Sequence, residues 1–202
     1  MTCILATNNP DKVRELRALF GVINIEVLSL KDIGLDFIPR EDGNTFEANA
    51  RQKAREVGER LDQNFIIMAD DSGLCIDVLG GLPGVDSALY MGRDTPYDIR
   101  NAHILEQMRG VPEEKRTARF VCVAACVLPN GEIISATGTM EGRIALESAG
   151  DDGFGYDPIF YLPEYGCTNA QLSMEEKNKI SHRGKAMRQM IEMIKDEGLC
   201  KF

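Results

Sequence analysis

Apolar residues recur along this chain with two different spacings, which predicts a mixture of strands and helices. Short apolar runs between turn-forming residues predict strands at residues 3–7, 65–69, 119–128 and 133–138, with a further candidate strand at 25–30. Apolar residues three and four positions apart predict helices at 11–20, 45–61 and 97–108, a short helix that opens at Ser173, and a last helix that ends near residue 197. Residues 129–132 (PNGE) are typical of a hairpin turn. The pattern predicts an α/β protein with a mixed sheet flanked by helices.

Two adjacent acids interrupt this pattern at the end of the predicted strand 65–69. Asp70 and Asp71 stand where the strand would leave the sheet, and a second apolar run, 74–79, follows almost at once. Two carboxylates between buried segments need a cation or several hydrogen-bond donors to stay charged. The sequence Asp-Asp-Ser-Gly is also ordinary turn chemistry, so the pair alone indicates a turn as readily as an active site.

A candidate anion site lies at the join between the first strand and the first helix, residues 8–12 (NNPDK). Pro10 suits a first helical turn, and Thr7, Asn8 or Asn9 could cap it. Backbone N–H groups at such a join can bind an anion, and Lys12 adds a positive charge. The GxxxxGK[ST] pattern of a P-loop is absent, and a plain turn with a solvated lysine remains an alternative.

Helix 45–61 contains a lysine at an unexpected position. Its apolar stripe includes Ala50, Ala54 and Val57, and at 3.6 residues per turn Lys53 falls within the same stripe. A lysine that faces the interior is costly unless an anion meets it there, although a snorkelling side chain is the usual explanation. The polar loop before the helix supplies Glu41.

Two later segments are also unusual. In residues 150–160, Gly153 and Gly155 flank Phe154, an arrangement that lets the backbone approach a ligand while the ring stacks, or that simply forms a glycine-rich loop with a buried Phe. Residues 177–185 carry five basic or titratable side chains, either as an anion site or as a solvated helix face: Lys177, Lys179, His182, Arg183 and Lys185.

Composition narrows the classes of function. The 202 residues fit one α/β domain, or one domain in two lobes, and we expect a single domain spanning 1–202. No run approaches the ~20 apolar residues of a membrane span, and no secretory signal is present, so we expect a cytoplasmic protein. The net charge of −9 argues against a nucleic-acid polymer as partner. Six cysteines without CxxC spacing favour reduced thiols over a zinc site or disulfides: Cys3, Cys75, Cys122, Cys126, Cys167 and Cys200.

Together these features describe a site for a nucleotide. Cationic groups suit phosphates, carboxylates suit Mg²⁺, and an aromatic ring suits a base, so the residues predict a cleft that hydrolyses a nucleotide.

Five segments, in this order, resemble one family over the whole chain. They are residues 7–12 (TNNPDK), Glu41 with 45–50 (TFEANA), 69–74 (ADDSGL), 153–158 (GFGYDP) and 181–186 (SHRGKA). The chain is similar to the inosine triphosphate pyrophosphatase family, house-cleaning enzymes that hydrolyse dITP, ITP and XTP. The resemblance implies an elongated α/β fold with two lobes around a central cleft, usually a homodimer. It also implies Mg²⁺ and release of nucleoside monophosphate and pyrophosphate.

The same resemblance assigns roles to residues. Asp71 matches the general base and a metal ligand, and Glu41 the other ligand, while the neighbouring Asp70 could share either role. Phosphate-side contacts match Thr7, Asn8, Asn9, Pro10, Asp11, Lys12 and Ser72, and substrate-binding lysines match Lys53 and Lys177. Base recognition matches Phe154, Gly155, Tyr156, Asp157, His182 and Arg183. Phe154 would stack on any purine, and His182 and Arg183 are the candidate donors to an oxygen at purine position 6.

The chain departs from the family pattern at a few positions. Asp86 and Leu89 stand where relatives often carry Tyr and Arg, and Gln171 stands where they often carry Glu. Two other classes of function are weighed against the resemblance. A phosphatase with an aspartyl nucleophile needs DxD spacing, whereas the acids here are adjacent, and a non-catalytic nucleotide sensor would not need the intact acidic pair.

Overall fold

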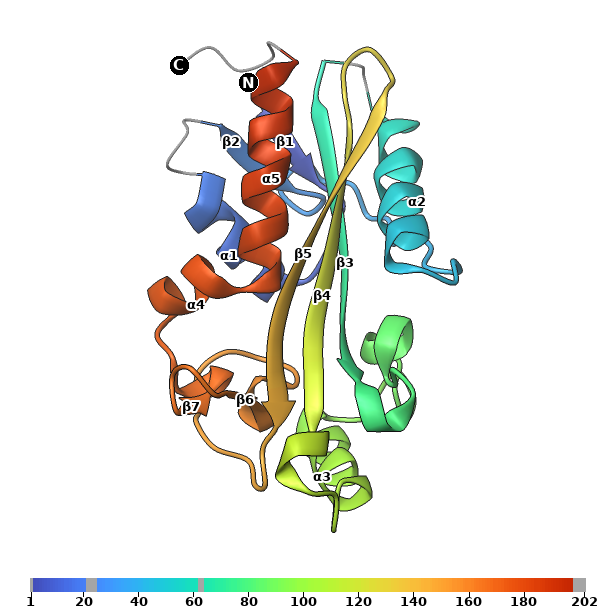
Figure 1. Ribbon diagram of the computed structural model, residues 1–202. Coiled ribbons are helices and arrows are strands. Elements are labelled where there is room, and N and C mark those ends of the chain that lie inside the picture. Colours follow the sequence, from blue (N-terminus) through green and yellow to red (C-terminus); the bar gives the residue numbers. More distant parts are fainter. Residues whose placement is uncertain (1, 21–24, 62–63, 198–202) are drawn as a thin grey trace. The chain divides into compact units, whose positions relative to one another are not determined.

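The computed structural model describes residues 2–20, 25–61 and 64–197 (Figure 1). Seven strands hydrogen-bond in the order β2-β1-β3-β4-β5-β6-β7. Strand β1 pairs in parallel with β2 and β3, whereas β6 pairs antiparallel with β5 and β7, so the predicted mixed sheet is confirmed. The strands are β1 (Thr2–Leu5), β2 (Glu26–Ser29), β3 (Ile66–Ile76), β4 (Thr117–Val127), β5 (Ile133–Ile144), β6 (Phe160–Leu162) and β7 (Cys167–Thr168). The helices are α1 (Pro10–Phe20), α2 (Phe46–Gly58), α3 (Tyr97–Gln107), α4 (Met174–Ile180) and α5 (His182–Asp196).

The chain forms two compact units, each built from separate stretches of sequence. Unit 1 comprises residues 1–71, 122–138 and 182–202, and unit 2 comprises 72–121 and 139–181. Strands β3, β4 and β5 each contribute residues to both units.

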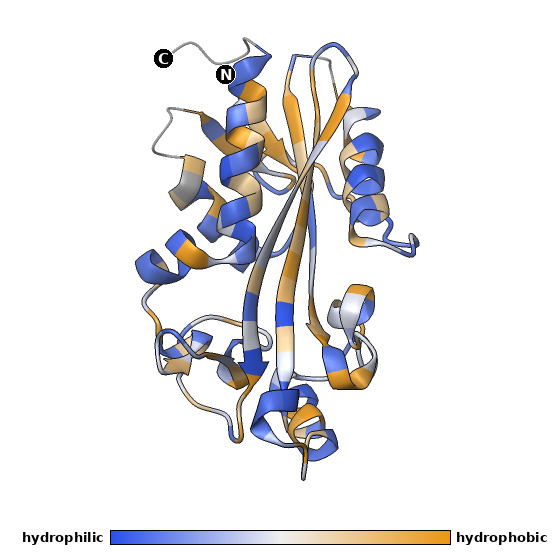
Figure 2. Cartoon of the chain, in the orientation of Figure 1, coloured by the Kyte–Doolittle hydropathy of each residue, from blue (hydrophilic) through white to orange (hydrophobic). Residues whose placement is uncertain are grey.

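Unit 1 has helices on both faces of its strands. Alternate strand residues enter two different hydrophobic clusters: Leu5 and Met68 pack with α1 and α5, whereas Ile4 and Ile67 pack with α2. This follows from the period of two in a strand, which sends neighbouring side chains to opposite faces. Figure 1 shows α1 and α5 on one side of these strands and α2 on the other. In Figure 2, α5 alternates between blue and orange along its length, as expected for a helix with one buried face.

Unit 2 has its own core, in which Leu74 and Ile76 of β3 pack with Ile104 of α3 and Phe160 of β6. The Ser173 capping box predicted for the start of α4 is confirmed, since Glu176 N donates to Ser173 Oγ at 3.3 Å. Gln171 closes a second capping box, because its amide oxygen accepts from Thr168 N at 2.9 Å. An amide oxygen thus performs here what a carboxylate oxygen would, which explains why Gln is tolerated at this position.

The predicted strand 65–69 is wrong at its C-terminal end. The strand does not end at Ala69; β3 continues through Asp70, Asp71, Ser72 and Gly73 to Ile76. The acidic pair was read as a strand end because two charges in mid-strand are costly to bury. The structure removes that cost by placing cations beside the pair, as described below.

Other boundaries differ by a few residues. Helix α2 ends at Gly58, three residues before the predicted end, and β5 extends to Ile144 instead of ending at Gly138. Gly138 was read as a strand end, but its lack of a side chain serves packing: a Cβ there would lie 2.2 Å from His182 O in the first turn of α5.

None of the helices in the described ranges has the length and apolar character needed to cross a membrane. The five described cysteines form no disulfide with one another, and Cys200 lies outside the described residues.

Candidate active site

The acidic pair of unit 1 lies beside the C-terminal end of β1, at the point of the sheet where the strand order reverses. Strand β1 stands between β2 and β3. Helix α1 connects β1 to β2 on one face of the sheet, and α2 lies in the connection from β2 to β3 on the opposite face. In an open α/β sheet, the carboxyl ends of strands at such a point form the usual ligand site. Leu5 pairs with Met68, which brings the segment after β1 next to Asp70.

Asp70 is held by two cations. Its side chain is 1% exposed, and Oδ2 lies 2.9 Å from Lys12 Nζ and 3.2 Å from Arg183 Nε. Burial alone would raise the pKa of this carboxyl, but Lys12 and Arg183 outweigh it and bring the pKa far below its ordinary value of 3.8. Asp70 is therefore firmly ionised.

Asp71 has the opposite environment. Burial raises its pKa above 3.8, and the nearby Lys53 and Lys12 offset this only in part. Asn49 Nδ2 donates to Asp71 Oδ2 at 3.0 Å and so orients the carboxyl group. Adjacent acids whose environments move their pKa values in opposite directions are typical of acid–base sites, in which one group is a fixed charge and the other exchanges a proton.

Lys53 joins Asp71 to Glu41. Its side chain is 6% exposed, Nζ lies 3.5 Å from Asp71 Oδ1, and Nζ also donates to Glu41. Burial works against its charge, but the two carboxylates prevail and raise the pKa of Lys53. The snorkelling alternative is therefore wrong, since the ammonium group is buried and paired.

The side chain of Asn9 caps the start of α1. Asn9 Oδ1 accepts from the backbone N–H groups of Asp11 at 2.9 Å and Lys12 at 3.3 Å, as one of the predicted caps. Asn8 Nδ2 donates to Phe37 O at 3.0 Å. Because Asn9 occupies these first-turn N–H groups, the charge of Lys12 is the clearest anion-binding feature of this segment.

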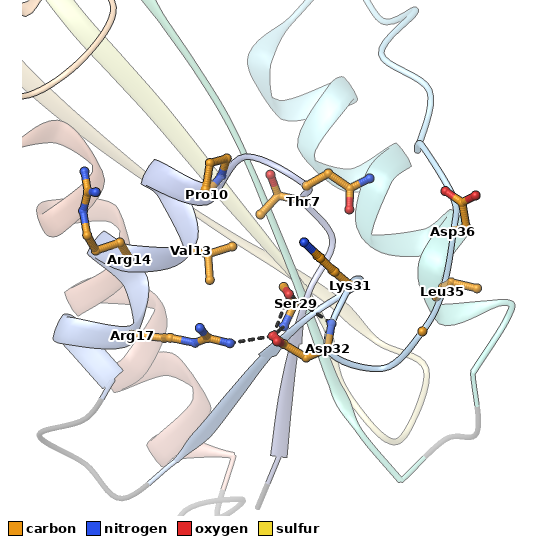
Figure 3. A pocket seen from close by; sticks show the side chains of 12 residues that line it. Thr7, Pro10, Val13, Arg14, Arg17, Ser29, Lys31, Asp32, Leu35 and Asp36 are labelled. Atoms are coloured by element: carbon orange, nitrogen blue, oxygen red, sulfur yellow. Dashed lines mark hydrogen bonds and ion pairs between the residues drawn. The ribbon is translucent and has the colours of Figure 1, made fainter.

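A cavity of about 760 Å³ adjoins this segment (Figure 3). Arg17 and Ser29 both donate to Asp32, with Arg17 Nη2 at 2.5 Å and Ser29 N at 2.7 Å from its carboxylate. The cavity is lined by Thr7, Asn8, Pro10, Val13, Arg14, Arg17, Ser29, Lys31, Asp32, Gly34, Leu35 and Asp36. The acidic pair and Lys53 do not line this cavity, whereas three of the predicted phosphate contacts do: Thr7, Asn8 and Pro10.

Arg183 lies between two carboxylates of unit 1. Besides Asp70 it donates to Glu15 of α1, and its side chain is 4% exposed. This geometry favours a role in holding Asp70 over the expected donation to a purine oxygen. His182, the first residue of α5, is also buried, at 5% exposure.

In unit 2 the predicted aromatic loop is closed around Asp157. Lys177 Nζ lies 2.6 Å from Asp157 Oδ2, and Phe154 N donates to the same oxygen at 3.0 Å. Lys177 Nζ also lies 4.9 Å from the centre of the half-buried Phe154 ring. Tyr156 is 3% exposed and donates its hydroxyl to Ser87 O at 2.8 Å. Of the predicted base-recognition residues, Phe154 and Gly155 are only partly buried, whereas Tyr156 and Asp157 face inward.

Sequence reasoning missed several residues that position these groups. Asn49, at the edge of the apolar stripe of α2, and Glu15, one of several charged residues of α1, were not singled out as site residues. Asn101 and Asn169, which contact the aromatic loop, gave no signal beyond being polar residues next to apolar ones. Each of them contacts a partner from another part of the sequence, as with Glu15 and Arg183, which are 168 positions apart.

The donor set of unit 1 fits Mg²⁺. Glu41 and Asp71 supply hard oxygen donors and converge on the same ammonium group, so one cation can reach both. Within the described ranges, no cluster of three or more His, Cys, Asp or Glu side chains forms a complete metal cage. Mg²⁺ commonly takes one or two carboxylates and completes its shell with water and substrate phosphates, which agrees with this pair.

Known proteins match this chain over nearly its whole length. The model of the Ham1 family matches residues 3–193. The dITP/XTP pyrophosphatase of Clostridium perfringens is 42% identical over 196 residues, which cover 95% of this chain and 96% of that protein. The dITP/XTP pyrophosphatase of Geobacillus kaustophilus is 48% identical over 190 residues, with 94% and 92% covered. The structure of the Staphylococcus aureus Ham1 protein matches with a TM-score of 0.86 at 36% identity, covering 98% of this chain and 100% of that one.

Proposed function

The chain belongs to the Ham1 family, and we propose from this premise that it hydrolyses dITP, ITP and XTP to the nucleoside monophosphate and pyrophosphate. The resemblance read from the five sequence segments is thereby confirmed, and the chain is a hydrolase of the nucleoside triphosphate pyrophosphatase class. The observation that best supports the proposed reaction is the consecutive pair Asp70 and Asp71 in β3, whose side chains contact different cations and have pKa values moved in opposite directions.

Asp71 is the proposed general base. Burial raises the pKa of Asp71, which makes its carboxylate a better proton acceptor than that of an ordinary aspartate. Asn49 holds one of its oxygens, and Lys53 lies near the other. Asp71 would take a proton from the water that attacks the α-phosphorus.

Asp70 has a supporting role in this proposal. It stays ionised and fixes Lys12 through the 2.9 Å contact between Oδ2 and Nζ. Lys12 would attract the triphosphate. Lys53 would also bind it, once the triphosphate competes with the carboxylates for its ammonium group. Thr7 to Asp11 and Ser72 complete the proposed phosphate contacts.

Glu41 and Asp71 would hold the metal. When bound, Mg²⁺ would neutralise part of the triphosphate charge and polarise its oxygens. The chain's own contribution is to place two carboxylates within reach of one cation, with Lys53 compensating their charge.

The aromatic loop is the proposed site for the base. Phe154 would stack on the purine, Gly155 would let the backbone come close, and Lys177 would support the ring from one side. Tyr156 and Asp157, whose side chains are buried, would hold the loop in this conformation. For the oxygen at purine position 6, His182 remains a proposed donor, while Arg183 acts mainly through Asp70.

Further parts of the proposal rest on the family resemblance and the substrate. We propose that residues 1–202 act as one functional domain, that the chain forms a homodimer, and that it works in the cytoplasm, where free nucleotides are abundant. A nucleic-acid polymer and a membrane are not among its proposed partners.

One assay tests the reaction. The protein is incubated separately with ITP and ATP in the presence of Mg²⁺, and the products are separated and identified. We expect IMP and pyrophosphate from ITP, and much slower reaction with ATP. Stepwise release of orthophosphate through a diphosphate intermediate would contradict the proposal and favour a phosphatase, and binding without turnover would favour a nucleotide sensor.

A further inference from the structure

Two buried amides of unit 2 leave their oxygen atoms unpaired. Within the part of the chain that the structure describes, the buried side-chain oxygens without a hydrogen-bond partner are Asn101 Oδ1 and Asn169 Oδ1. Asn101 is 5% exposed and Asn169 is fully buried. An unpaired buried oxygen is costly and uncommon, so each of these asparagines calls for an explanation.

The other end of each amide contacts the same loop. Asn101 Nδ2, on α3, donates to Gly155 O at 3.1 Å. Asn169 Nδ2, in the turn before α4, donates to Asp157 Oδ1 at 2.7 Å. Both side chains therefore donate to residues of the 153–157 loop, while their oxygen atoms accept no hydrogen bond.

The backbone of this loop is unusual. Gly153 and Gly155 have φ values of +85° and +69°, in the left-handed region that favours glycine. A Cβ on Gly153 would lie 2.4 Å from Asp157 Oδ2, so the Asp157 carboxylate fills the space beneath this turn. That carboxylate is fixed at one oxygen by Asn169 and at the other by Lys177 and Phe154 N.

We propose that Asn101 and Asn169 are positioning residues that hold the 153–157 loop and thereby set the affinity for the purine. This inference rests on the proposed function, in which Phe154 stacks on the base. Asn101 fixes the carbonyl that follows Phe154, and Asn169 fixes the carboxylate that accepts from the Phe154 N–H group. The two amides touch no group assigned to proton transfer, so they affect KM and leave kcat nearly unchanged.

The first test separates positioning from general stability. In Asn101→Leu, the loss of one hydrogen bond should raise KM for ITP by about 3–10-fold, with kcat within about 2-fold of the original. The melting temperature should change little, because the substitution leaves Gly155 O without its donor but also removes the unpaired Asn101 oxygen. Asn169→Leu should raise KM at least as much, since Asn169 donates to a carboxylate. Gln107→Leu is the matched control, an amide replaced on the same helix where its partner is Tyr90 and not the loop.

Inorganic tripolyphosphate serves as a second probe, since it lacks a base. Its inhibition constant should be the same in the original protein and in both asparagine variants. KM values equal to that of Gln107→Leu would overturn the inference. A tripolyphosphate constant that rises in step with KM would also overturn it, because the damage would then not be specific to the base.

A direct readout of the loop keeps the inference separate from the activity. The chain contains no tryptophan, so Phe154→Trp introduces a single indole on the loop. Adding Asn101→Leu and Asn169→Leu in this background should move the emission maximum to longer wavelength, as the indole becomes more solvated. Unchanged emission would contradict the inference. If ITP is not hydrolysed at all, the proposed function fails, while this measurement still decides whether the amides hold the loop.

Discussion

Asp70→Asn tests whether the buried charges of unit 1 stabilise the protein as the contacts indicate. The substitution keeps the shape of the side chain but removes the charge that faces Lys12 and Arg183. Arg183 keeps its contact with Glu15, and Lys12 is 15% exposed and can gain some hydration. Both cations are therefore left partly, and not wholly, without compensation.

The expected loss lies at the lower end of the range for a broken buried ion pair. Removing one partner typically costs ~3–5 kcal/mol, and the remaining contacts of Arg183 and Lys12 favour ~3 kcal/mol here. For a chain of this size, each kcal/mol lowers Tm by ~2–4 °C, so we expect a fall of ~6–12 °C. A typical total stability of ~5–15 kcal/mol leaves the variant folded.

The pH dependence of this loss has a definite sign. The pKa of Asp70 is lowered in the folded protein, and an aspartate in the unfolded chain titrates near ~3.9. The stability that this group contributes is therefore fully present above about pH 5 and is lost as the pH falls below ~4. The difference between the original protein and Asp70→Asn should be constant from about pH 5 to 8 and should shrink below about pH 4.

Urea unfolding at a series of pH values measures this difference. Glu113→Gln is the control, since it removes an exposed ion pair with Arg143 at 3.0 Å, and exposed pairs contribute under ~1 kcal/mol. A loss in Asp70→Asn no larger than in the control would refute the reasoning. So would a difference that grows as the pH falls, because Asp70 would then not be the group that is ionised.

Three further predictions concern the reaction. Asp71→Asn should lower kcat for ITP by at least ~10²-fold while circular dichroism shows an intact fold, and near-original turnover would shift the base role to Asp70 or Glu41. Excess EDTA should abolish activity, and Glu41→Gln should raise the Mg²⁺ concentration needed for half-maximal rate; full activity in EDTA would remove the metal from the proposal. Phe154→Ala should raise KM for ITP and ATP by similar factors, because stacking does not distinguish purines, and a collapse of the ITP/ATP preference in kcat/KM would show that this ring selects the base.

Local pattern was enough to predict most elements of the fold. The apolar spacing of α1, α2, α3 and α5 and the apolar runs of β4 and β5 are properties of neighbouring residues, so the sequence alone revealed them. The same is true of the capping box at Ser173 and of the hairpin turn at 129–132. Boundaries failed where long-range packing decided them, as at Gly138, whose missing side chain admits α5.

The candidate site, too, was predicted in part from local sequence and in part decided by long-range contacts. The residue types at Asp70, Asp71, Lys12 and Lys53 were visible in the sequence, and a lysine on the apolar stripe indicated either an anion partner or a snorkelling side chain. Only the tertiary structure decides which of these groups pair. Arg183 of α5 pairs with Asp70 and helps to keep it ionised, whereas burial raises the pKa of Asp71. Electrostatic effects between side chains act over a few ångströms regardless of sequence distance. The sequence therefore determined which charges the protein has, and the tertiary structure decided which of them meet.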